Sequence, residues 1–269
     1  MELYKQVLRQ TVTYRLFTSI LANVNDFSET LGNITICGIK TIKAIFKGEM
    51  SSKELIEQCE RFGISSLPIT LSIVGMTTVI IVSQIAQEMV KQGGGNMVGA
   101  LVSILMVREL GVIMSGFAII SMIGSSLASE IATMRVTEQI DALRTLKVNP
   151  FGYLFAPRVL AGMIMMPPVV IISSFIGVLM GALTSNLVSG LSYRAFFDSL
   201  WLGIFAKDLF ICIAKAFCFG GAIALISCSF GYHAKGGAKG VGIATTGAVV
   251  WSFVAIVIID MIFAIGFFF

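Results

Sequence analysis

The stretch from Ser129 to Arg158, SEIATMRVTEQIDALRTLKVNPFGYLFAPR, is a charged island between two long apolar stretches. Its apolar side chains recur every three or four residues, which predicts an amphipathic helix from Glu130 to Lys147. Asn149-Pro150 favours the end of this helix, because a proline disfavours helical conformation in the residue before it. We therefore expect a short, regular helix in this loop, at about residues 129–147.

The composition places the chain among membrane proteins. Hydrophobic residues make up 56% of the 269 residues and charged residues 13%, whereas soluble domains contain about 25% charged residues. The mean hydropathy of +0.91 agrees with this class. The net charge of +4 is small and scattered, so it does not indicate a nucleic-acid partner. The expected fold class is an all-α polytopic membrane protein.

Five stretches are long enough to cross a membrane, because about 20 apolar residues span a hydrocarbon core roughly 30 Å thick. The predicted spans are approximately Ile64 to Gln87, Met97 to Leu127, Val159 to Leu187, Leu209 to Phe230 and Ala248 to Phe268. The chain then divides into an N-terminal part, residues 1–62, and a five-span membrane domain, residues 63–269.

Lys and Arg residues are distributed unevenly between the loops, and such residues are enriched on the cytoplasmic side of membrane proteins. With the N-terminus inside, the outer segments hold only Lys91, Arg194 and Lys207. An odd number of spans then puts the C-terminus on the outer side. The loop from Ser129 to Arg158 is expected to face the cytoplasm.

The first 62 residues are not expected to be a cleavable signal peptide. Charges at Glu2, Lys5, Arg9 and Arg15 leave no uninterrupted apolar core of the required length. Further on, Ile34 to Lys47 mixes isoleucines with regularly spaced lysines, as expected of a helix in the lipid headgroup layer with its lysines toward anionic lipid. A solvated helix packed on a partner is the alternative.

Motifs of enzymes are missing from the sequence. Lys235 and Lys239 lie in a glycine-rich turn but are not followed by Ser or Thr, so this turn is not a phosphate-binding P-loop. There is no GxSxG or HExxH motif and no CxxC pair. We expect neither a cofactor, a metal nor a disulfide, and chemistry by this chain alone is not expected.

Ionisable residues within apolar spans are costly in lipid and indicate a site or a buried partner. These residues are Arg108, Glu109, Asp208, Lys215 and Asp260. Because adjacent helical residues point about 100° apart, Arg108 and Glu109 are expected to reach different neighbours. Asp208 and Lys215, seven residues apart, are expected on one helix face. A functional and a structural role both stay open for Arg108 and Glu109, whereas we favour a structural role for the others.

The predicted loop helix has two faces. Its apolar stripe consists of Ala132, Val136, Ile140 and Leu143. Its charged ridge consists of Arg135, Glu138, Asp141 and Arg144. The apolar stripe can pack on the membrane domain while the charged ridge docks on a soluble protein. A merely solvated charged face is the alternative.

Several motifs in this order match one family. They are Arg108-Glu109-Leu110-Gly111, Ala128-Ser129-Glu130-Ile131, Met134 to Leu143 (MRVTEQIDAL), Asn149-Pro150 and Pro157-Arg158. With them the chain resembles the MlaE/YrbE permeases of MCE lipid-transport ABC systems. The resemblance continues upstream in Arg61 to Ile69 and downstream in Asp208, Lys215, Gly231-Tyr232 and Val249 to Ser252. It covers approximately Leu31 to the C-terminus.

The resemblance implies a homodimer of five-span subunits in the bacterial inner membrane, with the C-terminus on the periplasmic side. Each subunit would bind a cytoplasmic ATPase (MlaF-like) through the loop helix and meet an MCE-domain protein (MlaD-like) on the outer side. A small regulatory STAS-type protein is a further expected partner. ATP hydrolysis in the partner would open and close a cavity at the dimer interface, moving phospholipid or a related lipid.

The resemblance also assigns roles to residues. Arg108, Glu109 and Lys215 would line or support the lipid cavity, and Asp208 and Asp260 stay structural charges. The residues coupled to the ATPase would be Glu130, Arg135, Glu138, Asp141 and Arg144. Two other classes compete with this assignment: a self-sufficient secondary transporter or channel that uses the intramembrane charges, and a purely structural membrane anchor. Five spans without an inverted repeat disfavour the transporter.

Overall fold

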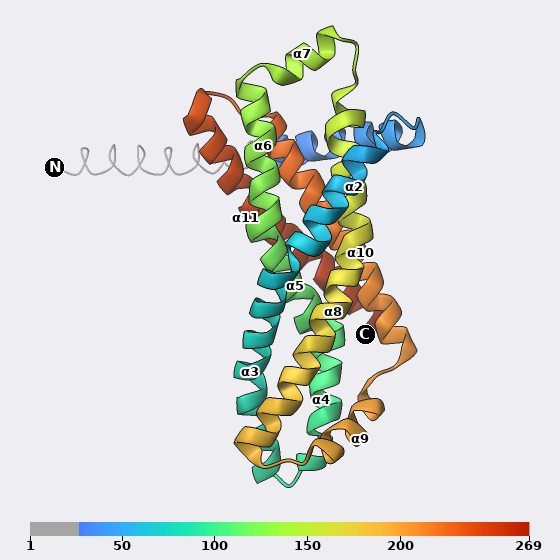
Figure 1. The fold of residues 1–269 in the computed structure, drawn as a ribbon, viewed down its shortest axis with the longest axis vertical. Coiled ribbons are helices and arrows are strands. Elements are labelled where there is room, and N and C mark those ends of the chain that lie inside the picture. Colours follow the sequence, from blue (N-terminus) through green and yellow to red (C-terminus); the bar gives the residue numbers. More distant parts are fainter. Residues whose placement is uncertain (1–26, 269) are drawn as a thin grey trace, which may run out of the picture.

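The computed structural model describes residues 27–268, and every regular element in this part of the chain is a helix (Figure 1). Five helical stretches are long and apolar enough to cross a membrane. They are Ser52–Lys91, Gly95–Val136, Phe151–Ser189, Ala206–Tyr232 and Gly237–Phe267. The expected all-α fold with five spans is therefore confirmed. The charges that argue against a signal peptide lie outside the described residues.

The first two spans are each built from several helical segments. The first comprises α2 (Ser52–Glu60), the π-helical η1 (Arg61–Ser65) and α3 (Leu67–Lys91). The second comprises η2 (Gly95–Met97), α4 (Val98–Leu105), the π-helical η3 (Met106–Leu110), α5 (Gly111–Ile119), the π-helical η4 (Ile120–Gly124) and α6 (Ser125–Val136).

The remaining elements complete the bundle. They are α7 (Gln139–Thr145), the π-helical η5 (Phe151–Phe155), α8 (Ala156–Ser189), α9 (Tyr193–Gly203), α10 (Ala206–Tyr232) and α11 (Gly237–Phe268). Helix α7 lies at one end of the bundle, and α9 and the turn between α3 and α4 lie at the other (Figure 1). Helix α9 was not predicted. It forms most of the connection between the third and fourth spans.

Two helical stretches begin before the predicted spans. The first begins at Ser52, ahead of Ile64, and the predicted division at residue 62 lies within η1. The last helix begins at Gly237, well before Ala248. In both cases polar or small residues continue a helix beyond the apolar stretch, because they pack on neighbouring helices at the bundle end.

The prediction of one continuous helix from Glu130 to Lys147 is wrong. Helix α6 extends the second span to Val136, and α7 is a separate helix of seven residues. The break lies at Glu138, whose φ of 60° is in the left-handed region that ends right-handed helices. The apolar face survives this break, because Ile140 of α7 is fully buried beside Ile131 of α6.

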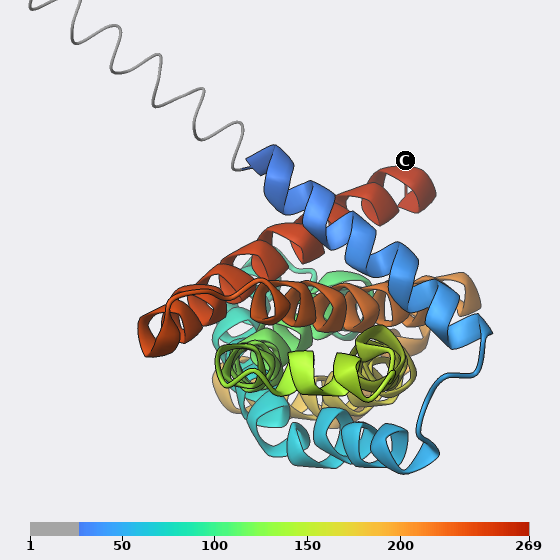
Figure 2. The ribbon, with the colours of Figure 1, turned by 90° about the horizontal axis from the view of Figure 1, so that it is seen from above.

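The N-terminal helix, residues 27–46, lies crosswise to the spans at the end of the bundle that carries α7 (Figures 1 and 2). One of its faces, with Cys37 and Thr41, is buried against the bundle. Another face exposes apolar side chains, including Phe46, which is 87% exposed. A helix with this orientation and an uncovered apolar face suits the membrane surface.

Helices α8 and α10 approach each other closely in the core. A Cβ atom on Gly162 of α8 would overlap the carbonyl of Gly220 in α10, and a Cβ on Gly220 would overlap the carbonyl of Gly162. Glycine is needed at both positions because the two backbones touch. The surrounding core includes Phe62, Met166 and Phe219.

Candidate functional site

The five intramembrane ionisable residues form two connected ion-pair groups. Arg108 of η3 contacts Asp208 of α10, with 3.0 Å between Nη2 and Oδ2. Lys215 of α10 lies 3.3 Å from Oε1 of Glu109 and 2.7 Å from Oδ1 of Asp260 in α11. Its ammonium also donates a hydrogen bond of 2.8 Å to the carbonyl of Arg108. We call these five residues the intramembrane charge network.

The helix geometry explains this arrangement. Arg108 and Glu109 point in different directions and reach different partners, as predicted from their adjacency. Asp208 and Lys215 lie seven residues apart, so both face η3 from one side of α10. The network thus ties the second, fourth and fifth spans together. The structure joins Asp208 and Asp260 by ion pairs to the predicted cavity residues Arg108 and Lys215.

The network reaches the surface of the single chain at membrane depth. At about 1.5 Å per helical residue, Glu109 lies roughly 20 Å along its span from Gly95, and Asp260 lies roughly 12 Å from the end of α11. The side chain of Glu109 is 34% exposed and that of Asp260 13%, whereas Lys215 is fully buried. Charged groups facing lipid chains are costly. This surface therefore requires a polar cavity or another protein chain.

An apolar surface of α11 adjoins the network. The exposed large apolar side chains on α11 include Val250, Val254, Val257, Ile258, Met261 and Ile262. The face that carries charged groups and the apolar face thus lie next to each other, which is the pattern of an amphiphilic binding surface.

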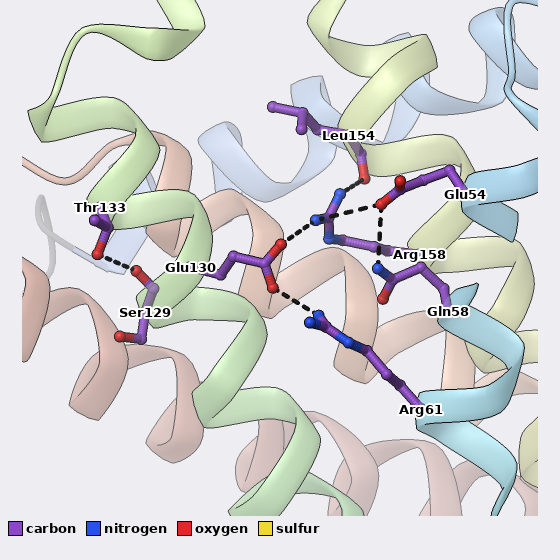
Figure 3. Close-up of polar contacts among 8 residues, drawn as sticks. All are labelled: Glu54, Gln58, Arg61, Ser129, Glu130, Thr133, Leu154 and Arg158. Atoms are coloured by element: carbon purple, nitrogen blue, oxygen red, sulfur yellow. Dashed lines mark hydrogen bonds and ion pairs between the residues drawn. The ribbon is translucent and has the colours of Figure 1, made fainter. Parts of the chain in front are cut away.

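A second ion-pair cluster lies near the end of α6 and the start of α8, and Figure 3 shows its residues. Glu130 of α6 accepts hydrogen bonds of 2.7 Å from Arg61 and 2.6 Å from Arg158. Arg158 also donates to the carbonyl of Leu154 and lies 3.8 Å from Glu54 of α2. The side chain of Arg158 is only 2% exposed. This α2–α6–α8 cluster holds three helices together directly below α7.

The cluster shows the contacts of Glu130. The resemblance assigned this residue to the helix that would couple to an ATPase. In the structure its carboxylate points from α6 toward α2 and α8 and is held between two arginines (Figure 3). Arg61 and Arg158 belong to motifs of the resemblance, but the sequence indicates no function for them beyond a charged residue beside an apolar span.

The other predicted coupling residues do not form a ridge on one helix. Arg135 of α6 and Arg144 of α7 both contact the carboxylate of Asp141, at 2.8 and 3.1 Å. Both guanidinium groups also lie over the ring of Tyr232 in α10, and Arg144 donates a hydrogen bond to its hydroxyl. Glu138 is exposed at the break between the helices. Tyr232 belongs to a motif of the resemblance, but the sequence does not indicate that α7 contacts the fourth span through it.

A metal site is not found in the described part of the chain. Among residues 27–267, no group of three His, Cys, Asp or Glu side chains lies close enough to hold a metal ion. The described cysteines are all free.

These features define a multi-span helical membrane protein with the five ionisable residues of the charge network within its spans and a short helix, α7, that contacts the fourth span at one end of the bundle. The family described as Permease MlaE matches residues 55–265. The chain belongs to the MlaE permease family.

Individual relatives agree with this family. A probable ABC transporter permease protein of Synechocystis is 37% identical over 214 residues, 80% of this chain and 81% of the relative. A protein of the same description from Rickettsia prowazekii is 35% identical, over 86% of this chain and 90% of the relative. The chloroplast protein Trigalactosyldiacylglycerol 1 of Arabidopsis thaliana is 34% identical, over 88% of this chain and 67% of that protein. Permeases of ABC transporters work with an ATPase partner.

Proposed function

We propose that this chain is the permease subunit of an ABC transporter that moves phospholipid or a related lipid between the inner membrane and an MCE-domain protein on the outer side. The observation that carries this proposal is that the intramembrane charge network is partly exposed, at Glu109, beside the apolar face of α11. The name of the chloroplast relative contains that of a galactolipid, which supports a lipid as substrate. A separate ATPase supplies the energy.

The surface of the network suits an amphiphile. The side chain of Arg108 is 31% exposed, and a guanidinium is a strong partner for a lipid phosphate. The apolar residues of α11 suit acyl chains. A second copy of this chain, facing α11, would enclose the surface and remove Glu109 from contact with bulk lipid. The proposed assembly is therefore a homodimer with the lipid cavity at its interface.

The contacts of α7 give the ATPase a route to this cavity. The side of α7 away from the bundle exposes Gln139, Ala142, Thr145 and Leu146, beside Glu138. An ATPase bound there would move Arg144 and, through Tyr232, the end of α10. Helix α10 carries Lys215 of the charge network. In this orientation α7 and the N-terminus face the cytoplasm, the C-terminus faces the periplasm, and a STAS-type protein is a further regulatory partner of the assembly.

The test is lipid transfer by the purified assembly in vesicles, followed with a fluorescent phospholipid. Glu109→Lys brings a third cation beside Arg108 and Lys215, so we expect transfer to fall at least about tenfold while the ATPase still co-purifies. Loss of the ATPase together with transfer would instead assign Glu109 to assembly. Lipid transfer or ion flux by this chain alone would overturn the proposal in favour of a self-sufficient transporter.

Docking of the ATPase is tested at Glu138. Reversal of Asp141 would also break its contacts with Arg135 and Arg144, so Glu138→Lys is the sharper change. We expect this variant to lose ATPase co-purification. Glu138→Asn is the matched control, because asparagine tolerates the left-handed backbone and carries no reversed charge. Equal ATPase binding by the unaltered chain, Glu138→Lys and Glu138→Asn would exclude this surface as the docking site.

A further inference from the structure

A basic pocket lies between the N-terminal helix and the segment that follows α7. Its volume is about 330 Å³, and its lining residues are Lys40, Lys43, Ala44, Lys47, Asn149 and Phe151. Lys40 lies 5.1 Å above the ring of Phe151. The pocket is separate from both the intramembrane charge network and the α2–α6–α8 cluster.

The pocket concentrates positive charge. The three lysines recur at intervals of three and four residues, so they lie on one side of the helix, where like charges repel each other. Glu49 lies 4.0 Å from Lys47, and its other oxygen accepts a hydrogen bond of 2.6 Å from Asn149. A single carboxylate leaves an excess of positive charge, so an anionic ligand would be stabilised here.

The position of the pocket identifies the source of the anion. The apolar face of the same helix exposes Ile36, Ile39, Ile42 and Phe46. This face lies beside the lysines around the helix axis, and the helix runs crosswise to the spans (Figure 2). A helix with adjacent apolar and basic faces at the end of a membrane bundle lies at the level of the lipid headgroups.

We propose that this pocket binds the headgroup of an anionic phospholipid as a resident ligand, distinct from transported lipid. The phosphate lies among Lys40, Lys43 and Lys47, and the acyl chains lie along the apolar face of the N-terminal helix. The partner is a lipid and not an acidic protein surface, because the uncovered isoleucines next to the lysines suit acyl chains.

A bound headgroup would also hold the segment after α7. The residues that follow the N-terminal helix already touch η5 at the end of this segment, since a Cβ on Gly152 would overlap the backbone of Glu49. A ligand that neutralises the lysines stabilises the helix beside Asn149 and Phe151. The anionic lipid therefore stabilises the segment that connects α7 to the third span.

The experiment uses the full chain in nanodiscs of phosphatidylcholine to which a photoactivatable phosphatidylglycerol is added. We expect the lipid to label peptides that contain residues 40–47 and 149–151. Because each basic side chain contributes strongly to binding an anionic surface, K40Q/K43Q/K47Q should reduce this labelling at least about tenfold. Phosphatidylglycerol should also slow hydrogen exchange of residues 146–151 in the unaltered chain but not in this variant.

Two matched variants separate a defined pocket from general charge attraction. K53Q/K235Q/K239Q removes the same number of exposed lysines from the same end of the bundle, and it should keep labelling within about twofold. K40R/K43R/K47R keeps the charge and should keep the labelling, which also shows that the helix tolerates substitution. Equal losses in the two glutamine variants would overturn the pocket. Unchanged labelling together with loss of the ATPase in K40Q/K43Q/K47Q would assign the pocket to an acidic protein surface instead.

Discussion

Lys215 is a fully buried cation between the carboxylates of Glu109 and Asp260, so its replacement by methionine tests the charge network most directly. Methionine has a similar length and tolerates irregular surroundings. The substitution removes the ammonium from two carboxylates and from the carbonyl of Arg108. It leaves two negative groups close together inside the membrane.

The magnitude follows from the burial of the partners. Removing one member of a buried ion pair costs about 3–5 kcal/mol. Glu109 is one-third exposed, so solvent or a polar cavity screens part of its charge, whereas Asp260 is mostly buried. We therefore expect Lys215→Met to lower the free energy of unfolding by about 3 kcal/mol. For a chain of this size that corresponds to a fall in Tm of roughly 6–12 °C.

The assay is thermal unfolding of the purified chain in detergent, followed by the loss of its monodisperse elution peak. Lys215→Met with Asp260→Asn returns the network to its original net charge, so the double variant should recover at least about half of the lost stability. Lys91→Met, at an exposed position, should change Tm by no more than about 2 °C. Wild-type stability of Lys215→Met, or no recovery in the double variant, would refute the ion-pair reasoning.

Other substitutions test the remaining contacts by thermal unfolding. Glu138→Gly should raise stability by about 0.5–1 kcal/mol, because glycine adopts the φ of 60° without strain; a lower Tm would contradict a strained break. Arg158→Met should cost about 3 kcal/mol, because it leaves Glu130 with one cationic partner fewer; adding Glu130→Gln should recover part of the loss, and a fully additive cost would refute the pairing. Gly220→Ala should cost about 2–3 kcal/mol through its overlap with the backbone of α8. Gly266→Ala has open space around its Cβ and should change stability by less than about 0.5 kcal/mol; equal effects of the two alanines would exclude a close helix contact.

The number of spans could be predicted because it depends on the length of apolar stretches alone. Their ends could not, because charged residues continue a helix when they find partners on neighbouring helices. Arg61 lies just before the first predicted span in the sequence, but in the structure it pairs with Glu130 within a continuous helical stretch. The break at Glu138 escaped prediction for a different reason: no glycine or proline marks it, and the apolar periodicity resumes in α7.

The charge network was predictable in part. Adjacency on a helix correctly predicted that Arg108 and Glu109 reach different partners, and a spacing of seven correctly placed Asp208 and Lys215 on one face. The contact between Lys215 and Asp260 joins two different helices, and a single sequence contains no distance between helices. The contacts of Tyr232 could not be predicted for the same reason, since its partners lie on α6 and α7.

The contact between Gly162 and Gly220 restricts how α8 and α10 can move relative to each other. Sliding of α8 along α10 would bring Met166, one turn from Gly162, against the backbone at Gly220, whereas tilting leaves the two glycines in place. The contact is thus a fulcrum. On α10 it lies about 7 Å from Lys215 and about 18 Å from Tyr232, at 1.5 Å per residue. If α10 tilts about this contact, a sideways displacement of Tyr232 moves Lys215 in the opposite direction by less than half that displacement. A large movement at the α7 end therefore becomes a smaller movement within the membrane.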